Sequence, residues 1–283
     1  MTDAIEMAQD TCLSMLRDLD RDRYLACLLS PEPVRHSLAA LYAFNAELAR
    51  IRDLVHEPLP GEVRMQYWRD LLEGNPHGST QANPVAAALL RTIEIHSLPS
   101  NVLVNMIEAR IFDLYDDPME SRAALEGYAG ETASALIQLC SLVLSPIGAA
   151  QSSDAAGHAG VAQAIAGLLL LMPLHSHRGQ VYLPAEILAA TGLDREGFLA
   201  RQDRTRISAA IEAFAGLGRD HLAKARQSHL SREVFPAFLP VSLAEPILLK
   251  AQKLGADLFD RSFQPAQWRR QLRLLRSSMR NRF

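Results

Sequence analysis

Apolar positions along the chain recur at the spacing of α-helices. Between residues 33 and 55 they fall three or four residues apart, which is the period of one face of an amphipathic helix. Two further segments, around residues 65–72 and 207–214, show the same period. Runs of β-branched residues are nearly absent, and prolines stand where helices should begin or end. The pattern predicts an all-α protein, with residues 1–283 forming one domain of ten or more helices. The positions that define the first helical face are Leu38, Leu41, Phe44, Leu48, Ile51 and Val55.

One segment departs from the amphipathic pattern. Residues 161–172, VAQAIAGLLLLM, have no polar face, which predicts a helix buried on all sides at the centre of the domain. The longest apolar run, residues 164–173, is shorter than the roughly 20 residues that span a bilayer. We expect this helix to stop at Pro173, followed by a polar turn that carries His175 and His177. Residues 74–83 and 145–160, rich in small and polar side chains, are predicted to be loops.

Composition narrows the classes of function. With 48% hydrophobic and 22% charged residues the chain can bury a large core. The net charge of −3 gives no reason to expect a nucleic-acid partner. Three scattered cysteines suit neither a disulfide framework nor a zinc cluster. The acidic start, MTDAIEMAQDTC, lacks the features of a signal or transit peptide. We therefore expect a cytoplasmic protein, with peripheral contact to the inner membrane left open.

The two histidines raise the question of a metal site. His175 and His177 could supply two ligands, but no cysteine or carboxylate adjoins them to complete a zinc site. Positions i and i+2 of a helix also do not face each other. The sequence therefore predicts no metal at this point.

Two motifs carry a family resemblance. Tyr42-Ala43-Phe44 precedes a helical segment, and Gly179-Gln180-Val181-Tyr182-Leu183-Pro184 follows the apolar one. These resemble the motifs of the squalene/phytoene synthase superfamily, in which each adjoins an Asp-rich signature. The first signature falls on residues 49–53, where only Asp53 remains and Ala49 replaces its partner. The second falls on Leu171 and His175, so both of its aspartates are absent. The resemblance extends from about residue 22 to about residue 208 and implies an isoprenoid-synthase-type helical bundle with a central cavity.

The resemblance bears directly on catalysis. Enzymes of this family join two isoprenoid diphosphates, and Mg²⁺ ions held by the aspartate pairs bind the diphosphates and assist their departure. Because three of the four carboxylates are missing, we expect no cofactor and no magnesium-dependent catalysis. The alternative is an active head-to-head prenyltransferase that uses farnesyl or geranylgeranyl diphosphate at an atypical site with Mg²⁺. Asp113 and Asp117, at i, i+4 spacing, are the candidate replacement carboxylates, although Asp116 and Asp117 are better interpreted as solvated residues before Pro118.

A ligand site can persist without catalysis. Arg50, Arg52 and Arg178, together with His175, could hold an anionic group by charge alone. The competing interpretation is that Arg50 and Asp53 form an ion pair beside a closed cavity. The residues that we expect to line the ligand pocket are Tyr42, Phe44, Arg50, Asp113, Tyr128, Gln163, Arg178 and Tyr182.

Four segments place the chain within one branch of the superfamily. The resemblance is to the branch that contains the mitochondrial respiratory complex I assembly factor and its bacterial relatives, in which the Asp-rich signature is also absent. It implies a pseudoenzyme at the membrane periphery whose partners are complex I subunits or assembly intermediates. A lipid or prenyl diphosphate ligand, and a lipid carrier without an assembly partner, remain open alternatives. The segments are LYAFNAELARIRD (41–53), RMQYWRDLLE (64–73), ARIFDLYDDP (109–118) and FPAFLPVSL (235–243).

The C-terminal segment, about residues 265–283, is basic. Leu272, Leu275 and Met279 would form an apolar strip on a helix, flanked by arginines, a pattern typical of contact with an anionic membrane. Packing of the same strip on the domain is an equal alternative. FPAFLPVSL is expected to be a hydrophobic plug rather than a partner-binding loop. The arginines proposed for membrane or partner contact are Arg269, Arg270, Arg273 and Arg276.

Overall fold

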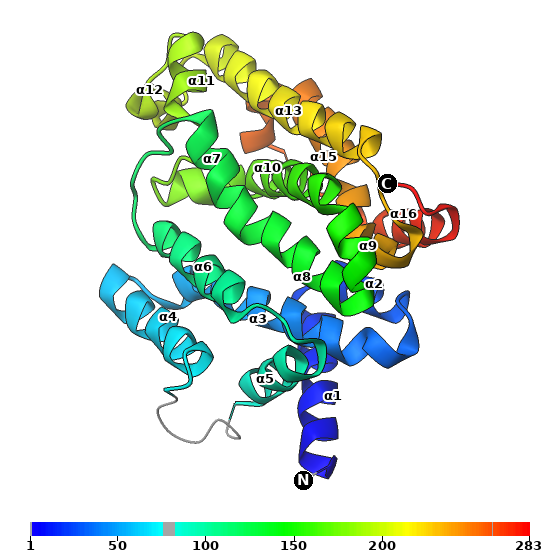
Figure 1. Ribbon diagram of the computed structural model, residues 1–283. Coiled ribbons are helices and arrows are strands. Elements are labelled where there is room, and N and C mark those ends of the chain that lie inside the picture. Colours follow the sequence, from blue (N-terminus) through cyan, green and yellow to red (C-terminus); the bar gives the residue numbers. More distant parts are fainter. Residues whose placement is uncertain (1, 76–82, 262) are drawn as a thin grey trace.

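The computed structural model describes residues 2–75, 83–261 and 263–283, and every regular element in these ranges is a helix (Figure 1). This confirms the all-α prediction. The elements of the first half are α1 (Thr2–Leu19), α2 (Arg21–Leu28), η1 (Glu32–Val34), α3 (Arg35–Leu54), α4 (Pro58–Leu72), α5 (Pro84–His96), α6 (Ser100–Ile111), η3 (Phe112–Leu114), α7 (Arg122–Ala129), η4 (Gly130–Ser134), α8 (Ala135–Leu144) and α9 (Pro146–Gln151). Those of the second half are α10 (Ser153–His177), α11 (Ala185–Ala190), α12 (Arg195–Ala200), α13 (Arg204–Gln227), η5 (Arg232–Val234), α14 (Phe235–Phe238), η6 (Leu239–Leu243), α15 (Ala244–Leu254), η7 (Gly255–Phe259) and α16 (Gln267–Arg280).

Helix boundaries follow the local chemistry of the chain. Pro58, Pro84 and Pro146 each occupy the first residue of a helix, where the missing N–H has no intrahelical partner to lose. The Asn83 side chain caps α5 by accepting from two backbone N–H groups, and the Ser121 side chain caps α7 by accepting from the backbone N–H of Ala124. The predicted use of prolines as helix boundaries is therefore confirmed at these starts.

Helix α10 runs through the middle of the fold and packs against α13, α15, α8 and η4 (Figure 1). The prediction that it stops at Pro173 is wrong, because the helix continues past this proline to His177. The two histidines therefore lie in its last turn and not in a polar turn after it. The helix is also not buried on all sides: Leu171 and Leu174 are 47% and 42% exposed, because this side of α10 faces a cavity.

The predicted loop at residues 145–160 is wrong as well. This segment forms α9 and the first turns of α10. Its small residues serve close packing: a Cβ at Gly160 would lie 2.3 Å from the backbone nitrogen of Ser134 in η4. Most of the other predicted loop, residues 76–82, lies outside the described residues.

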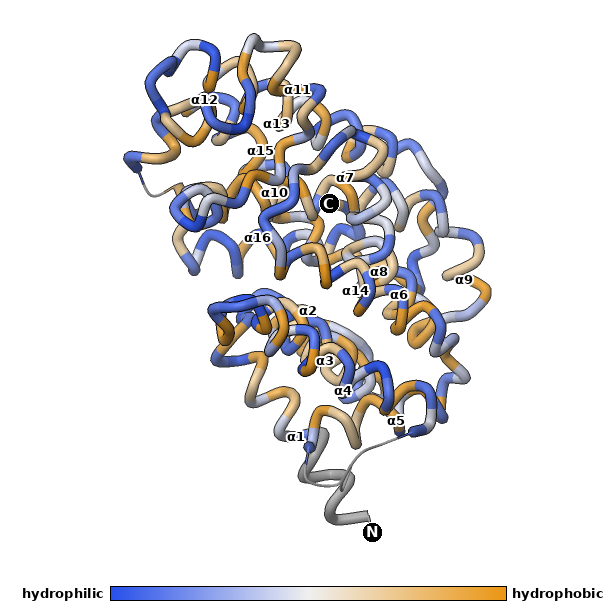
Figure 2. Tube along the Cα trace, turned by 90° about the vertical axis from the view of Figure 1, so that its left-hand side faces the viewer, coloured by the Kyte–Doolittle hydropathy of each residue, from blue (hydrophilic) through white to orange (hydrophobic). Residues whose placement is uncertain are grey.

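The described residues form three hydrophobic core clusters. The first joins α1, α3, α5 and α8, the second joins α10, α13 and α15, and a smaller third one joins α2, α14, η6 and α16. Figure 2 shows α2, α3 and α4 on one side and α7, α10 and α16 on the other. A cavity lies between these two sides, and residues from both sides line it.

Two segments are long and apolar enough, by length and composition, to cross a membrane: Ser153–His177 and Arg232–Phe259. In the fold 56% and 72% of their apolar windows are buried. Core helices of globular proteins have the same properties, so we assign neither segment to a membrane.

The contact between α10 and η4 yields a test with a control on the same helix. Gly160→Ala should lower the free energy of unfolding by about 2 kcal/mol, because the new methyl group meets backbone that cannot rotate away. Gly157→Ala, where a Cβ meets nothing within 4 Å, should stabilise the helix by up to about 1 kcal/mol. Urea unfolding of both variants provides the comparison, and equal effects would show that the crossing is not tightly packed.

Candidate functional site

A cavity of about 550 Å³ lies between α2 and α3 on one side and α10 on the other. This volume falls within the roughly 300–1,000 Å³ of small-molecule sites. The four degenerate motif positions all line it, Ala49 and Asp53 from α3 and Leu171 and His175 from α10. The positions aligned from the two sequence motifs thus come together at one site.

The other candidate residues divide into two groups. Asp113, Tyr128, Gln163, Arg178 and Tyr182 line the cavity. Three candidates from α3 do not, because only one face of that helix borders the cavity, the face of Asn45, Ala49, Arg52 and Asp53. The three that lie elsewhere are Tyr42, which is 3% exposed beneath the Arg23 guanidinium, Phe44, which packs edge-on against Trp68, and Arg50.

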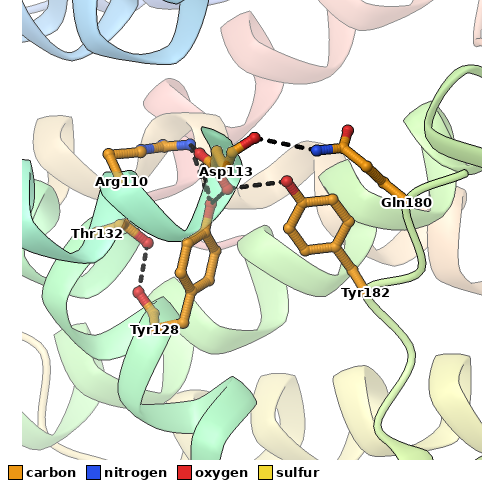
Figure 3. A network of polar contacts seen from close by, with 6 residues as sticks. All are labelled: Arg110, Asp113, Tyr128, Thr132, Gln180 and Tyr182. Carbon is orange, nitrogen blue, oxygen red and sulfur yellow. Dashed lines mark hydrogen bonds and ion pairs between the residues drawn. The ribbon is translucent and has the colours of Figure 1, made fainter. Parts of the chain in front are cut away.

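Asp113 lies at the centre of a polar network (Figure 3). Tyr182 and Tyr128 donate their hydroxyls to Oδ1 of Asp113 at 2.8 and 2.9 Å. Arg110 donates to Oδ2 at 3.1 Å, and the Gln180 side chain donates to the backbone oxygen of Asp113 at 3.0 Å. We call these five residues the Asp113 cluster. It ties together η3, α6, α7 and the segment after α10.

Burial fixes the protonation of this cluster. Burial raises the pKa of Tyr128 and of Tyr182, and the negative charge of Asp113 raises both further. Burial acts to lower the pKa of Arg110, but the oxygens of Tyr128 and Asp113 outweigh it and the pKa is raised. Two neutral phenols and one guanidinium therefore donate to one carboxylate, so Asp113 is engaged as an acceptor rather than free to act as a base or metal ligand.

The position of Tyr128 depends on the turn that follows it. Residues 130–134 form a π-helical turn, η4, and the Thr132 hydroxyl donates to the backbone oxygen of Tyr128 at 2.6 Å (Figure 3). Thr132 itself lines the cavity. Single π-turns inside helices occur frequently at functional sites, since they redirect a side chain without ending the helix.

The remaining carboxylates that line the cavity are paired with arginines. Arg178 of the opposite wall binds Asp53 at 2.6 Å, so the competing interpretation, in which Arg50 pairs with Asp53, is wrong. Arg23 binds Asp20 at 2.6 Å. Asp22 of α2 pairs with Arg270 of α16. With Arg110 and Asp113, the described cavity residues therefore form four such pairs.

The predicted anion site based on charge alone is not present in the form expected. Burial lowers the pKa of His175 to about 4, so this side chain is neutral at neutral pH. Arg178 is paired with Asp53, and Arg50 does not line the cavity. Of the described arginines that line the cavity, Arg52 has the most distant carboxylate: it donates to the Val55 carbonyl at 3.3 Å and lies 4.0 Å from Asp116.

The donor set does not fit magnesium. Mg²⁺ binds through carboxylates and phosphate oxygens in octahedral geometry, whereas the cavity carboxylates are each held by a guanidinium. Within the described ranges, no three His, Cys, Asp or Glu side chains are grouped to hold a metal ion. Asp117 does not line the cavity and does not form a second ligand beside Asp113.

Sequence reasoning missed several cavity residues. Asn45 could have been found from its i, i+4 spacing to Ala49, and Arg110 from its i, i+3 spacing to Asp113. Gln180 lies inside the Gly179–Pro184 motif. No sequence signal joins Asp22 to Arg270, because 248 residues separate them.

The C-terminal helix α16 is only partly as expected. Arg270 and Arg273 hold the helix to the domain through Asp22 and Glu245, so these two arginines are not free for a membrane or partner. The apolar strip predicted at Leu272, Leu275 and Met279 is exposed, at 37%, 46% and 76%. The FPAFLPVSL segment is a buried plug, with Phe235 and Phe238 at 2% and 0% exposure.

The contribution of these ion pairs to the fold can be tested by measuring the free energy of unfolding. Asp113→Asn should lower the free energy of unfolding by on the order of 3 kcal/mol, because it leaves a mostly buried guanidinium without a counter-charge. Asp53→Asn is the matched control: its pair with Arg178 is largely solvated, and its loss should cost about 0.5 kcal/mol or less. Urea unfolding with both variants checks this, and a neutral Asp113→Asn would contradict the structural role of the cluster.

Comparisons with known proteins support this architecture. Over 98% of this chain and 97% of the other, the fold matches the crystal structure of a dehydrosqualene synthase in complex with ligand, with a TM-score of 0.77 and 18% sequence identity. The chain is 35% identical over 274 residues to the mouse protein named NADH dehydrogenase (ubiquinone) complex I, assembly factor 6, covering 96% of this chain and 82% of the relative. The human protein of the same name is 35% identical over 255 residues, covering 89% and 76%.

The family follows from the span of the match. Residues 16–276 match the sequence pattern of the squalene/phytoene synthase family, including both walls of the cavity. The chain belongs to the squalene/phytoene synthase family.

Proposed function

We propose that this chain is a non-catalytic squalene/phytoene synthase relative that acts in the assembly of respiratory complex I. The observation that carries the proposal is the pairing of the cavity carboxylates with arginines where the family resemblance implies a magnesium cage. The relatives named as complex I assembly factors, at 35% identity over most of the chain, support the biological role.

The absence of catalysis follows from the chemistry of the leaving group. A diphosphate leaves with high negative charge, which metal ions must offset in the transition state. Ala49 and Leu171 offer no ligand, and His175 is neutral. The alternative, an active prenyltransferase with an atypical site, needs replacement carboxylates, and Asp113 is already occupied by its cluster.

The proposed partners are complex I subunits or assembly intermediates, with the chain at the inner membrane on its cytoplasmic side. Deleting its gene in the source organism should lower the amount of assembled complex I on native gels, while complex II stays unchanged. Re-expression of the wild-type chain should restore complex I. Normal complex I in the deletion strain would contradict the assembly role.

Turnover separates the pseudoenzyme from the alternative. Folded protein supplied with farnesyl or geranylgeranyl diphosphate, magnesium and NADPH should give no C30 or C40 product by mass spectrometry, because each carboxylate among the described cavity residues is already paired with an arginine. A magnesium-dependent product would contradict the non-catalytic proposal. It would leave the assembly role untouched, because the gene deletion tests that role separately.

We also propose that α16 contacts an anionic membrane surface. Trp268, at 60% exposure, extends the apolar strip of Leu272, Leu275 and Met279 along one helical face. Arg269 and Arg276 lie exposed beside the strip, while Leu274 and Ser277 on the opposite face are buried against the domain. An exposed apolar face flanked by cations matches the interface of an anionic bilayer.

Vesicle sedimentation tests this face. The chain should bind vesicles of phosphatidylcholine with added phosphatidylglycerol, and Met279→Glu should weaken binding at least fivefold, because it places a charge in the buried strip of the bound state. Val63→Glu is the matched control, since Val63 on α4 is 64% exposed but lies outside the strip. Equal loss in both variants would contradict a role for α16.

We further propose that the cavity retains a lipid or prenyl ligand. Its volume and its mixed apolar and polar lining support this.

A further inference from the structure

The charged side chains that line the cavity bear on which kind of ligand head group it can bind. We infer that the cavity binds an apolar chain with an uncharged, hydrogen-bonding head group and discriminates against a diphosphate. This inference rests on the proposed retention of a ligand. Four carboxylates and five guanidiniums line the cavity, and four of those guanidiniums are paired with those carboxylates: Arg23 with Asp20, Arg110 with Asp113, Arg178 with Asp53 and Arg270 with Asp22.

An incoming diphosphate would compete for these guanidiniums. To bind it, an arginine would have to leave its aspartate, and the aspartate would then remain unpaired in the cavity wall. Asp22 and Asp113 have side chains only 19% and 12% exposed, so an unpaired charge there is poorly solvated. Among the described residues that line the cavity, Arg52 is the one guanidinium not held by a cavity carboxylate; it lies 4.0 Å from Asp116, and a single charge does not offset a diphosphate without metal ions.

Uncharged hydrogen-bonding groups, by contrast, are available in the cavity. Asn45 of α3 is 4% exposed and lines the cavity, and Gln163 of α10 lines it from the other wall. Neither side-chain amide has a hydrogen-bond partner within the described part of the chain. A side-chain amide both donates and accepts hydrogen bonds, so these two are suited to a hydroxyl or carbonyl group of a ligand.

The rest of α10 provides an apolar wall for a chain. Ala164, Leu168 and Leu171 line the cavity along successive turns of this helix, and Leu243 and Ile247 line it from η6 and α15. Gly167 lies among them, and a Cβ at this position would meet nothing within 4 Å. The glycine therefore leaves space that a ligand can fill.

Two probes that differ only in the head group test the inference. Radiolabelled geranylgeraniol and geranylgeranyl diphosphate, each below its micelle concentration, are equilibrated with the full chain by dialysis, with and without magnesium. The alcohol should bind at least tenfold more tightly than the diphosphate, and magnesium should change neither affinity. Tighter binding of the diphosphate would overturn the inference but keep the proposed retention of a ligand. Failure of both probes to bind would overturn that retention as well.

Two substitutions locate the binding and identify its cause. Gly167→Leu should obstruct the cavity beside its apolar wall and abolish binding of the alcohol, whereas Gly157→Leu, on the same helix and outside the cavity, should leave it unchanged. Asp53→Asn frees Arg178 and removes a carboxylate that repels the diphosphate, so it should raise affinity for the diphosphate about twofold or more without changing that for the alcohol. Alcohol binding that survives Gly167→Leu, or diphosphate binding unchanged by Asp53→Asn, would contradict the assignment.

Discussion

The pairing of carboxylates with arginines around the cavity is the interaction on which the remaining properties of this protein depend. Asp113 accepts from Arg110, Tyr128 and Tyr182, and it thereby joins α6, α7 and the segment after α10. Buried carboxylates need partners. In the synthases that this family includes, the resemblance implies metal ions for that role, whereas here guanidiniums fill it. We propose that the same ion pairs that stabilise the walls make the cavity unsuited to a metal-bound diphosphate.

The packing of α10 makes this arrangement possible. Gly160 lets α10 cross η4 in close contact, and the π-helical turn sets Tyr128 toward Asp113. Farther along the same helix, Gly167 and Leu171 leave open space beside the apolar wall. One helix therefore provides both a tight crossing that rigidifies the core and the lining of a cavity large enough for a ligand. The family fold persists although the metal ligands do not.

Sequence reasoning predicted the helical class and the meeting of the two motifs, because both depend on local spacing within helices. It failed at residues 145–160, where small residues indicate a loop by composition but serve close packing in the fold. It failed at Pro173, where packing of α10 overrides the local penalty of a proline. It also missed the pair of Asp22 with Arg270, since contacts between distant segments leave no pattern in a single sequence.

Metal binding tests the central claim most directly. Mn²⁺ can replace Mg²⁺ at carboxylate sites, and its free concentration can be followed by electron paramagnetic resonance. With inorganic diphosphate present, the wild-type chain should leave the signal of unbound Mn²⁺–diphosphate unchanged. The triple variant Ala49→Asp, Leu171→Asp and His175→Asp serves as the comparison, because it adds three carboxylates to walls that already carry Asp53; it should reduce the signal. Stoichiometric uptake of Mn²⁺ by the wild-type chain would contradict the account.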